Sequence, residues 1–230
     1  MRHRVFVEQI EPKVTITGDE LHHSIRVVRV RVGEEVELFD RAGNAANGRV
    51  ESIERDRAVI VAGESLPSRE SPLAIHLAMA VINLDKFELV LQKATELGVR
   101  TIIPLVTEHV ELRPERYSGK NERWKRILFE AVRQSGRAVV PAIEPPAPFA
   151  NIIARSGTRL LFDAESEPDP VAHASELTVL IGPEGGWSAD ELRAAREHGV
   201  HFQRLGQRRM RAETAAIAAL AVLGSRFGDL

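Results

Sequence analysis

The stretch from Leu177 to Leu223 decides the fold: LTVLIGPEGGWSADELRAAREHGVHFQRLGQRRMRAETAAIAALAVL. Its first five residues, Leu177–Ile181, are apolar and predict a buried strand. The strand must stop at Gly182-Pro-Glu-Gly-Gly186, because no regular element continues through this sequence. Ser188-Ala-Asp-Glu191 is a capping box, so a helix is predicted from this point to near Gly199.

A second irregular loop follows in the same stretch. A short strand is predicted at His201–Leu205, and the next residues are Gly206-Gln-Arg-Arg-Met-Arg211. An alanine-rich helix is predicted from about Thr214. Two loops that follow two strands predict a pocket lined by backbone at the edge of an α/β sheet, which is where open α/β folds bind ligands.

The first third of the chain carries short strand signals in which apolar and polar residues alternate, as in half-buried antiparallel strands. The predicted strands are Arg4–Val7, Val14–Thr17, Glu35–Phe39, Asn47–Ile53 and Ala58–Val61. A short helix is predicted from Asp19, its expected N-cap, to about Val28. Residues 1–66 therefore predict a small β-barrel-like domain, and the polar residues 67–72 predict a linker.

From residue 73 onward the pattern alternates between strand and helix, which predicts a layered α/β domain with a mostly parallel sheet over residues 73–230. The predicted strands are Leu73–Ile82, Arg100–Val106 and Arg159–Asp163. One helix is predicted to start at an Asp85–Glu88 capping box and to end at Gly98, and another is capped by Asn121 and ends at Gly136. The segment Pro141–Pro148 is expected to be irregular.

Composition excludes several classes of protein. The 230 residues are 43% hydrophobic, which is ample for a core, and contain no cysteine, which excludes disulfides and thiolate metal sites. The N-terminal residues lack the apolar region of a signal peptide, and no apolar run approaches the roughly 18–20 residues of a membrane span. We therefore expect a soluble, cytoplasmic protein. His22-His23 lacks the spacing of a two-histidine helical metal site, and no metal is expected.

Net charge is −2, but basic residues cluster in three places. Arg113 to Arg137 contains eight lysines and arginines against three glutamates; the other clusters are Arg26, Arg29 and Arg31, and Arg204, Arg208, Arg209 and Arg211. Any one cluster is typical of a solvated surface. Three on an otherwise balanced chain favour a polyanionic partner.

The Gly182–Gly186 loop has the chemistry of a ligand loop, since glycines allow close backbone approach. A polyphosphate is disfavoured: the loop has neither a Walker A motif nor G-x-G-x-x-G spacing, and Glu184 places a negative charge in it. A positively charged, adenosine-bearing ligand such as S-adenosylmethionine suits it better. A tight strand-to-helix turn without a ligand is the alternative for this loop alone.

Both loops, Leu180–Ser188 and Leu205–Ala215, resemble the paired cofactor loops of the RsmE family. These proteins are 16S ribosomal RNA (uracil-N3) methyltransferases of the SPOUT superfamily. Further blocks resemble the same family: His22–Arg29 with Val32-Gly33, Leu91–Val99 and Glu130–Arg137. The chain departs from the family pattern at Gln207 and Arg209-Met210, which replace Pro and Ile-Leu, and at Ile82–Lys86.

The resemblance implies a PUA-like β-barrel followed by a C-terminal SPOUT methyltransferase domain with a trefoil knot. It also implies a homodimer, S-adenosylmethionine as cofactor, and 16S rRNA or the small ribosomal subunit as substrate, with no role for a membrane. Alternatives are a SPOUT enzyme that methylates another RNA position, such as a ribose 2′-hydroxyl or a tRNA base, and a non-catalytic RNA-binding protein.

Site residues follow from the same resemblance. The cofactor-binding candidates are Ile181, Gly182, Pro183, Glu184, Gly185, Gly186, Leu205, Gly206 and Met210. Arg211 is the first choice for polarising the uracil or holding its phosphate, with a salt bridge to Glu184 or Glu213 as its alternative role. Glu213 or Glu184 is the candidate base. Gln134, Ser135 and Arg137 are expected to reach the site from a neighbouring helix or subunit. The expected RNA contacts are Arg26, Arg29, Arg123, Arg126 and Arg137.

Overall fold

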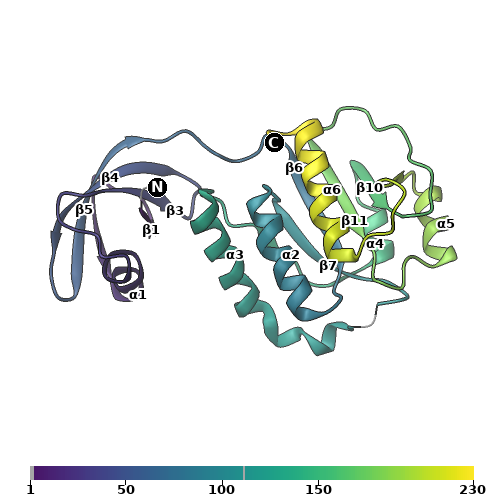
Figure 1. Ribbon diagram of the computed structural model, residues 1–230, viewed down its shortest axis with the longest axis horizontal. Helices are drawn as coiled ribbons and strands as arrows, with labels where there is room; N and C mark the ends of the chain where they lie inside the picture. The colour runs from purple at the N-terminus through teal and green to yellow at the C-terminus, as the bar shows by residue number, and fades with distance from the viewer. Residues whose placement is uncertain (1–2, 111) are drawn as a thin grey trace. The chain divides into compact units, whose positions relative to one another are not determined.

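A computed structural model describes residues 3–110 and 112–230, which form two compact units (Figure 1). The first unit contains residues 1–70 and 132–140, and the second contains residues 71–131 and 141–230. The first two residues of the predicted domain 1–66 lie outside the described part. No helix within the two described ranges is long and apolar enough to cross a membrane.

The first unit is built on a five-stranded sheet in the order β1-β3-β4-β5-β2. Its strands are β1 (His3–Val7), β2 (Lys13–Thr17), β3 (Glu35–Asp40), β4 (Ala45–Ile53) and β5 (Arg57–Ser65). All five predicted strands are confirmed, but β1 pairs with β3 in parallel, not antiparallel as expected. The helical segment between them supplies the crossover that parallel neighbours require.

That helical segment differs from the predicted helix. It consists of α1 (Gly18–Glu20) and a π-helical stretch, η1 (Leu21–Val27), and Arg29 follows with φ at +62°. Asp19 is not the N-cap: Thr17 holds that position, and its side chain makes no capping hydrogen bond. Tertiary hydrogen bonds hold this segment, since Glu20 accepts from the Phe6 backbone amide and from Arg133. Local helix propensity, on which the prediction was based, does not include these bonds.

Residues 132–140 belong to the first unit through buried and half-buried polar bonds. Arg4 donates to the Val132 carbonyl at 2.7 Å, and Arg133 pairs with Glu20 at 2.6 Å. Further along, Arg137 pairs with Glu70 at 2.6 Å. These nine residues therefore complete the N-terminal unit although they are distant from it in sequence.

The second unit contains a parallel sheet in the order β12-β10-β11-β6-β7-β8, with β9 also beside β7. Its strands are β6 (Ala74–Ala80), β7 (Thr101–Val106), β8 (Ala142–Ile143), β9 (Ala147–Pro148), β10 (Thr158–Phe162), β11 (Glu176–Ile181) and β12 (His201–Gln203). The expected central position of the strand near residue 73 is confirmed, since β6 lies between β11 and β7. The segment Pro141–Pro148, expected to be irregular, supplies two short strands at the sheet edge, where proline is tolerated.

Helices cover both faces of this sheet: α2 (Leu84–Glu96), α3 (Asn121–Ser135), α4 (Phe149–Ile153), α5 (Ala189–Glu197) and α6 (Ala212–Phe227). Helices α2 and α6 lie side by side on one face, and their apolar residues share a core with β6 and β11; α4 and α5 pack against the other face (Figure 1). Short 3₁₀ turns, η2 (Pro114–Arg116) and η3 (Ser118–Lys120), precede α3.

The helix starts test the capping predictions. The Ser188–Glu191 box is confirmed, with both reciprocal hydrogen bonds formed. The Asp85–Glu88 box is wrong: α2 is capped by Asn83, whose side chain accepts from the Asp85 amide at 2.9 Å, and Glu88 binds Arg123 instead. Helix α4 was not predicted.

Candidate active site

Three loops converge at the carboxyl ends of neighbouring parallel strands. Because β12, β10 and β11 are adjacent and parallel, the segments that follow them meet at one edge of the sheet. They enclose a cavity of about 630 Å³, here called the glycine-loop cavity. Its lining residues are Lys86, Phe162, Asp163, Ala164, Ile181, Gly182, Pro183, Glu184, Gly185, Gly186, Trp187, Arg204, Leu205, Gly206, Arg208, Arg209, Met210, Arg211, Ala212 and Ala215. All nine residues predicted to bind a cofactor lie in this wall.

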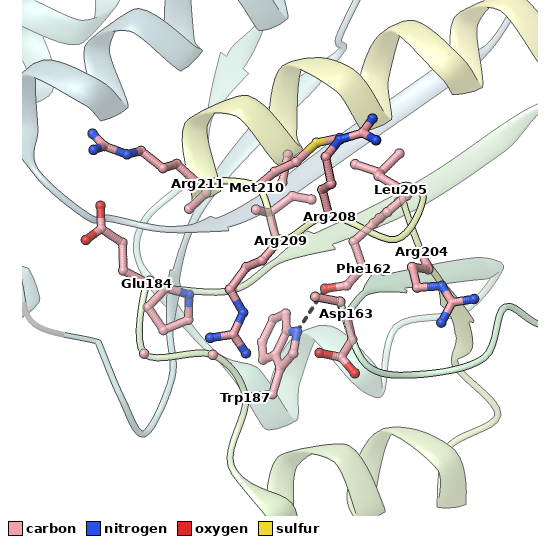
Figure 2. Close-up of a pocket in the computed structure, with 18 of the residues that line it drawn as sticks. Phe162, Asp163, Glu184, Trp187, Arg204, Leu205, Arg208, Arg209, Met210 and Arg211 are labelled. Carbon is pink, nitrogen blue, oxygen red and sulfur yellow. Dashed lines mark hydrogen bonds between the residues drawn. The ribbon is translucent and has the colours of Figure 1, made fainter.

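The first loop is held by Trp187. The indole Nε1 donates to the Phe162 carbonyl at 3.0 Å, as the dashed line in Figure 2 shows, and the ring packs on Phe149 with 5.3 Å between ring centroids. A Cβ at Gly182 would lie 2.9 Å from this indole. Glycine at position 182 is therefore required by packing, and the indole joins the loop after β11 to the end of β10.

The turn itself is set by backbone geometry. The Gly186 amide donates to the Pro183 carbonyl at 3.0 Å, and Gly186 has φ at +74°, a region that favours glycine. On the outside of the turn, a Cβ at Gly185 would lie 3.1 Å from the Cβ of His109. The glycines thus give a tight loop whose backbone faces the cavity.

The second loop, residues 204–211, is tied to the segment after β10 by two exposed ion pairs. Arg204 lies 3.2 Å from Glu167, and Arg209 lies 2.8 Å from Glu165. Within the described ranges, the backbone amides of the three predicted cofactor residues on this loop make no hydrogen bond; these residues are Leu205, Gly206 and Met210. Their N–H groups are free to donate to a ligand.

The charged groups of the cavity are organised by Lys86, near the start of α2. Its Nζ lies 2.6 Å from Glu184 Oε1 and 3.7 Å from Glu213 Oε1. The hydrogen bond from Lys86 lowers the pKa of Glu184, helped by the positive charge of Arg211, and the same bond raises the pKa of Lys86. Both side chains are therefore ionised at neutral pH.

Glu213 differs from Glu184. Its side chain is 13% exposed, and its Oε2 atom is buried and has no hydrogen-bond partner among the described residues. A buried carboxylate oxygen without a donor is costly, so it is a position for a ligand group or an ordered water.

Arg211 is exposed and lies on the same side of the cavity as Glu184 (Figure 2). In the part of the chain that the structure describes, it forms no salt bridge with Glu184 or Glu213. The alternative role considered for Arg211 is thus taken by Lys86. Lys86 also offsets the negative charge that Glu184 was expected to place in the loop, so charge alone does not argue against a phosphate there.

The residues expected to contact RNA fall into different environments. Arg137 is 5% exposed and paired with Glu70, so its guanidinium cannot reach a phosphate without breaking that pair, and we withdraw it as an RNA contact. Arg123 is exposed but bonded through two nitrogens to Glu88. The remaining three, Arg26, Arg29 and Arg126, are exposed, and Arg26 donates to the backbone carbonyl of Arg55. Neither Gln134 nor Ser135 lines the glycine-loop cavity.

Sequence reasoning missed two parts of this cavity. Lys86 lies in the first turn of α2, which follows β6, and Phe162 ends β10 and is followed by Asp163 and Ala164. Both segments lie at the carboxyl ends of strands that neighbour β11, so the parallel-sheet rule would have placed them here if the strand order had been known. The order depends on long-range pairing that periodicity does not reveal. No group of three or more potential metal ligands gathers among the residues in the described ranges.

Known protein families match most of the chain. Residues 69–224 match the RNA methyltransferase domain family, and residues 16–62 match the RNA methyltransferase PUA domain family. The chain is 31% identical to ribosomal RNA small subunit methyltransferase E of Synechocystis over 94% of its length and 74% of the relative's, and 29% identical to that of Bacillus subtilis over 96% and 95%.

A solved structure is also similar. Ribosomal RNA small subunit methyltransferase E from Neisseria gonorrhoeae, bound to S-adenosyl methionine, is 30% identical, with a TM-score of 0.90 and complete coverage of both chains. The predicted α/β fold with an N-terminal PUA-like domain is confirmed. The chain belongs to the ribosomal RNA small subunit methyltransferase E family of RNA methyltransferases.

Proposed function

We propose that this chain transfers a methyl group from S-adenosylmethionine to N3 of a specific uridine in the 16S rRNA of the small ribosomal subunit. The observation that carries the proposal is the glycine-loop cavity, where both loops that resemble the family's cofactor loops meet. The relative from Neisseria gonorrhoeae, whose structure matches this chain over its full length, is bound to S-adenosyl methionine.

The residues of the cavity fit this cofactor. An adenosine moiety needs apolar walls and a few polar partners. Ile181 and Leu205 supply apolar wall, and the backbone amides of Gly206 and Met210, which make no hydrogen bond within the described ranges, supply donors. Glu213 adds a buried carboxylate oxygen that lacks a partner among the residues that the structure describes. A cationic or hydroxyl-bearing ligand would satisfy it.

The proposed holding residues are Gly182–Gly186, Leu205, Gly206 and Met210, with Ile181 at the entrance. When bound, S-adenosylmethionine supplies a methyl group made electrophilic by its sulfonium. Placement of the acceptor accounts for much of the rate in such a reaction, and a rigid backbone cradle serves it well. The bond from Trp187 to the Phe162 carbonyl and the turn at Gly186 provide that rigidity.

The uracil N3 proton must also leave, because N3 is a weak nucleophile while protonated. Of the two candidate bases, Glu213 is favoured, since Glu184 already accepts a hydrogen bond from Lys86 that lowers its pKa. Arg211 and Lys86 are the cations available to stabilise the negative charge that develops on the uracil carbonyl oxygens. N3 lies on the Watson–Crick edge, so the uridine must be unpaired or flipped out.

Several finer features remain proposals. We infer a homodimer with a shared active site, a trefoil knot in the second domain, and a cytoplasmic location, where ribosomal subunits assemble. We also infer a domain boundary at residues 67–72, beyond which residues 132–140 return to complete the first unit. The dimer and the knot rest on the family resemblance, the boundary on the polar sequence with prolines at positions 67 and 72, and the location on the absence of cysteine from the sequence. The alanine-rich α6 is compatible with close packing in a dimer. Light scattering of the purified chain tests the dimer directly.

The test of the function is methyl transfer from labelled cofactor to unmethylated small subunits and, in parallel, to naked 16S RNA. Reverse transcription then locates the product, because an N3-methyl group blocks base pairing. We expect label incorporation and a single stop at a uridine. Incorporation without a stop would indicate a ribose or non-pairing position and would contradict the N3 assignment. Cofactor binding without incorporation into either substrate would point to tRNA or to a non-catalytic protein.

A further inference from the structure

A second cavity adjoins the glycine-loop cavity. It measures about 690 Å³, and its own walls are Ile82, Asn83, Leu84, Asp85 and Leu112. The two cavities share three lining residues, Lys86, Pro183 and Glu184, so they are neighbours on either side of a common wall. The shared wall is the turn of the first glycine loop together with the Lys86 side chain.

Methyl transfer sets a strict condition on where the acceptor base sits. Donor carbon and acceptor nitrogen must approach to about 3–3.5 Å, so the base must occupy a space that touches the cofactor space. The second cavity meets this condition through its shared wall. It is also large enough for a flipped-out nucleotide, since ligand pockets typically span about 300–1,000 Å³.

The chemistry of the second cavity suits a pyrimidine ring. Ile82, Leu84 and Leu112 provide apolar surface for the ring faces. The side-chain oxygen of Asn83 is used as the α2 cap, accepting from the Asp85 amide at 2.9 Å, which leaves the amide NH₂ group to donate. In the described part of the chain this NH₂ group has no partner.

We propose that this second cavity receives the uracil of the target nucleotide and that Asn83 donates to its O4 carbonyl oxygen; the inference rests on the proposed function. Uracil presents two carbonyl acceptors beside N3, whereas cytosine replaces one of them with an amino donor. A fixed amide donor that faces O4, the carbonyl that cytosine lacks, therefore favours uracil, and Lys86 at the shared wall places a positive charge where the base would lose its N3 proton.

The first arm of the test fills the cavity with Leu112→Trp, and Glu197→Trp on the exposed end of α5 serves as the matched control. We expect single-turnover methyl transfer to small subunits to fall about 100-fold or more in Leu112→Trp, while calorimetric cofactor affinity stays within about three-fold of wild type. The control should match wild type in both. Transfer by folded Leu112→Trp within about two-fold of wild type would overturn the proposal.

The second arm uses Asn83→Asp, which keeps the helix cap because Asn and Asp cap equally well, but replaces the donor with an acceptor. Saturation-transfer NMR with uridine and cytidine 5′-monophosphates, on protein saturated with S-adenosylhomocysteine, reports base binding without turnover. We expect the wild-type preference for uridine monophosphate to be lost, with an unchanged melting temperature. An unchanged preference, or no uridine signal in wild type, would overturn the proposal.

This second arm also decides the case if Leu112→Trp fails to fold, because position 83 is exposed. The two proposals fail differently. Wild-type protein that transfers no methyl group to any RNA contradicts the proposed function, whereas normal transfer by both variants contradicts only the uracil pocket.

Discussion

At the scale of single residues, Lys86 links two carboxylates that come from distant parts of the sequence. Glu184 lies in the first glycine loop and Glu213 in the first turn of α6, and both approach the same ammonium group. The sequence identified both glutamates but not the lysine between them. A lysine in a helix's first turn is ordinary in a sequence, and only strand order shows that it faces the loop.

The Lys86–Glu184 pair predicts a defined pH dependence. The bond lowers the pKa of Glu184 from 4.5 and raises that of Lys86 from 10.5, so the pair contributes fully between these values. Its contribution is lost as pH falls through the folded pKa of Glu184, or rises through that of Lys86. We expect the difference in melting temperature between wild type and Lys86→Met to be constant across neutral pH and to shrink below pH 4.5.

Thermal melts of both proteins from neutral pH down to about pH 3 measure this difference, since that range covers the carboxylate titration. Lys125→Met removes a comparable exposed pair with Glu122 outside both cavities and serves as the control. A difference for Lys86→Met that persists undiminished at the acid end would show that the ion pair is not its source.

Arg211 predicts a separation of catalysis from cofactor binding. It lies in the cavity wall, is exposed, and has no salt bridge to Glu184 or Glu213 within the described residues. We expect Arg211→Ala to lose methyl transfer by about 100-fold, typical of removing one stabilising donor, with cofactor affinity unchanged within a few-fold by calorimetry. A parallel loss of affinity would instead assign Arg211 to cofactor binding or folding.

At the scale of elements, the start of α3 is anchored by an aromatic cluster. Tyr117 follows the turn η2 and packs on Trp124 with 5.5 Å between ring centroids, and Trp124 packs on Phe87 of α2 at 5.0 Å. All three side chains are buried. The sequence predicted the apolar face that includes Trp124, but Tyr117 lies outside any periodic segment and carries no such signal.

Burial raises the pKa of Tyr117 to about 12, with the nearby charge of Glu115 adding to the shift. Because the neutral phenol is favoured in the folded state, its contribution to stability is present below pH 10 and is lost as pH rises toward 12. Tyr117 is the single tyrosine of the chain, so ultraviolet titration of phenolate reports it alone. We expect a midpoint near 12 for native protein and near 10 in denaturant; equal midpoints would contradict burial.

The elements show where sequence reasoning succeeds and fails. Strands and helices with strong periodicity were predicted, as was the Ser188–Glu191 capping box, because their signals are local. Asn83 competes with Asp85 as a cap only two residues away, and the sequence alone does not choose between them. The parallel pairing of β1 with β3 and the π-helical stretch after Glu20 depend on partners far along the chain.

At the scale of the whole molecule, the RNA contacts are expected to be electrostatic. Arg26 and Arg29 are exposed on the first unit, and each phosphate contact adds about one to the slope of log affinity against log salt. We expect the double variant Arg26→Glu, Arg29→Glu to weaken binding to small subunits and to flatten that slope by about 1–2. Filter binding over a salt series measures both quantities.

Arg193→Glu, at an exposed position of α5, makes the same change of charge per site and serves as the control. A slope for the double variant equal to wild type would exclude Arg26 and Arg29 as phosphate contacts. Arg137 shows why the RNA contacts could not all be predicted. Its charge is evident from the sequence, but its pairing with Glu70 depends on the fold.

Residues 132–140 carry a consequence for how the protein is made. The ribosome synthesises the strands of the first unit well before Arg133 and Arg137, which are the partners of Glu20 and Glu70. During synthesis, Glu20 and Glu70 therefore lack these arginine partners until more than half of the chain has been translated. A fragment that ends at residue 70 would lack the arginine partners of Glu20 and Glu70 and would not contain the whole N-terminal unit.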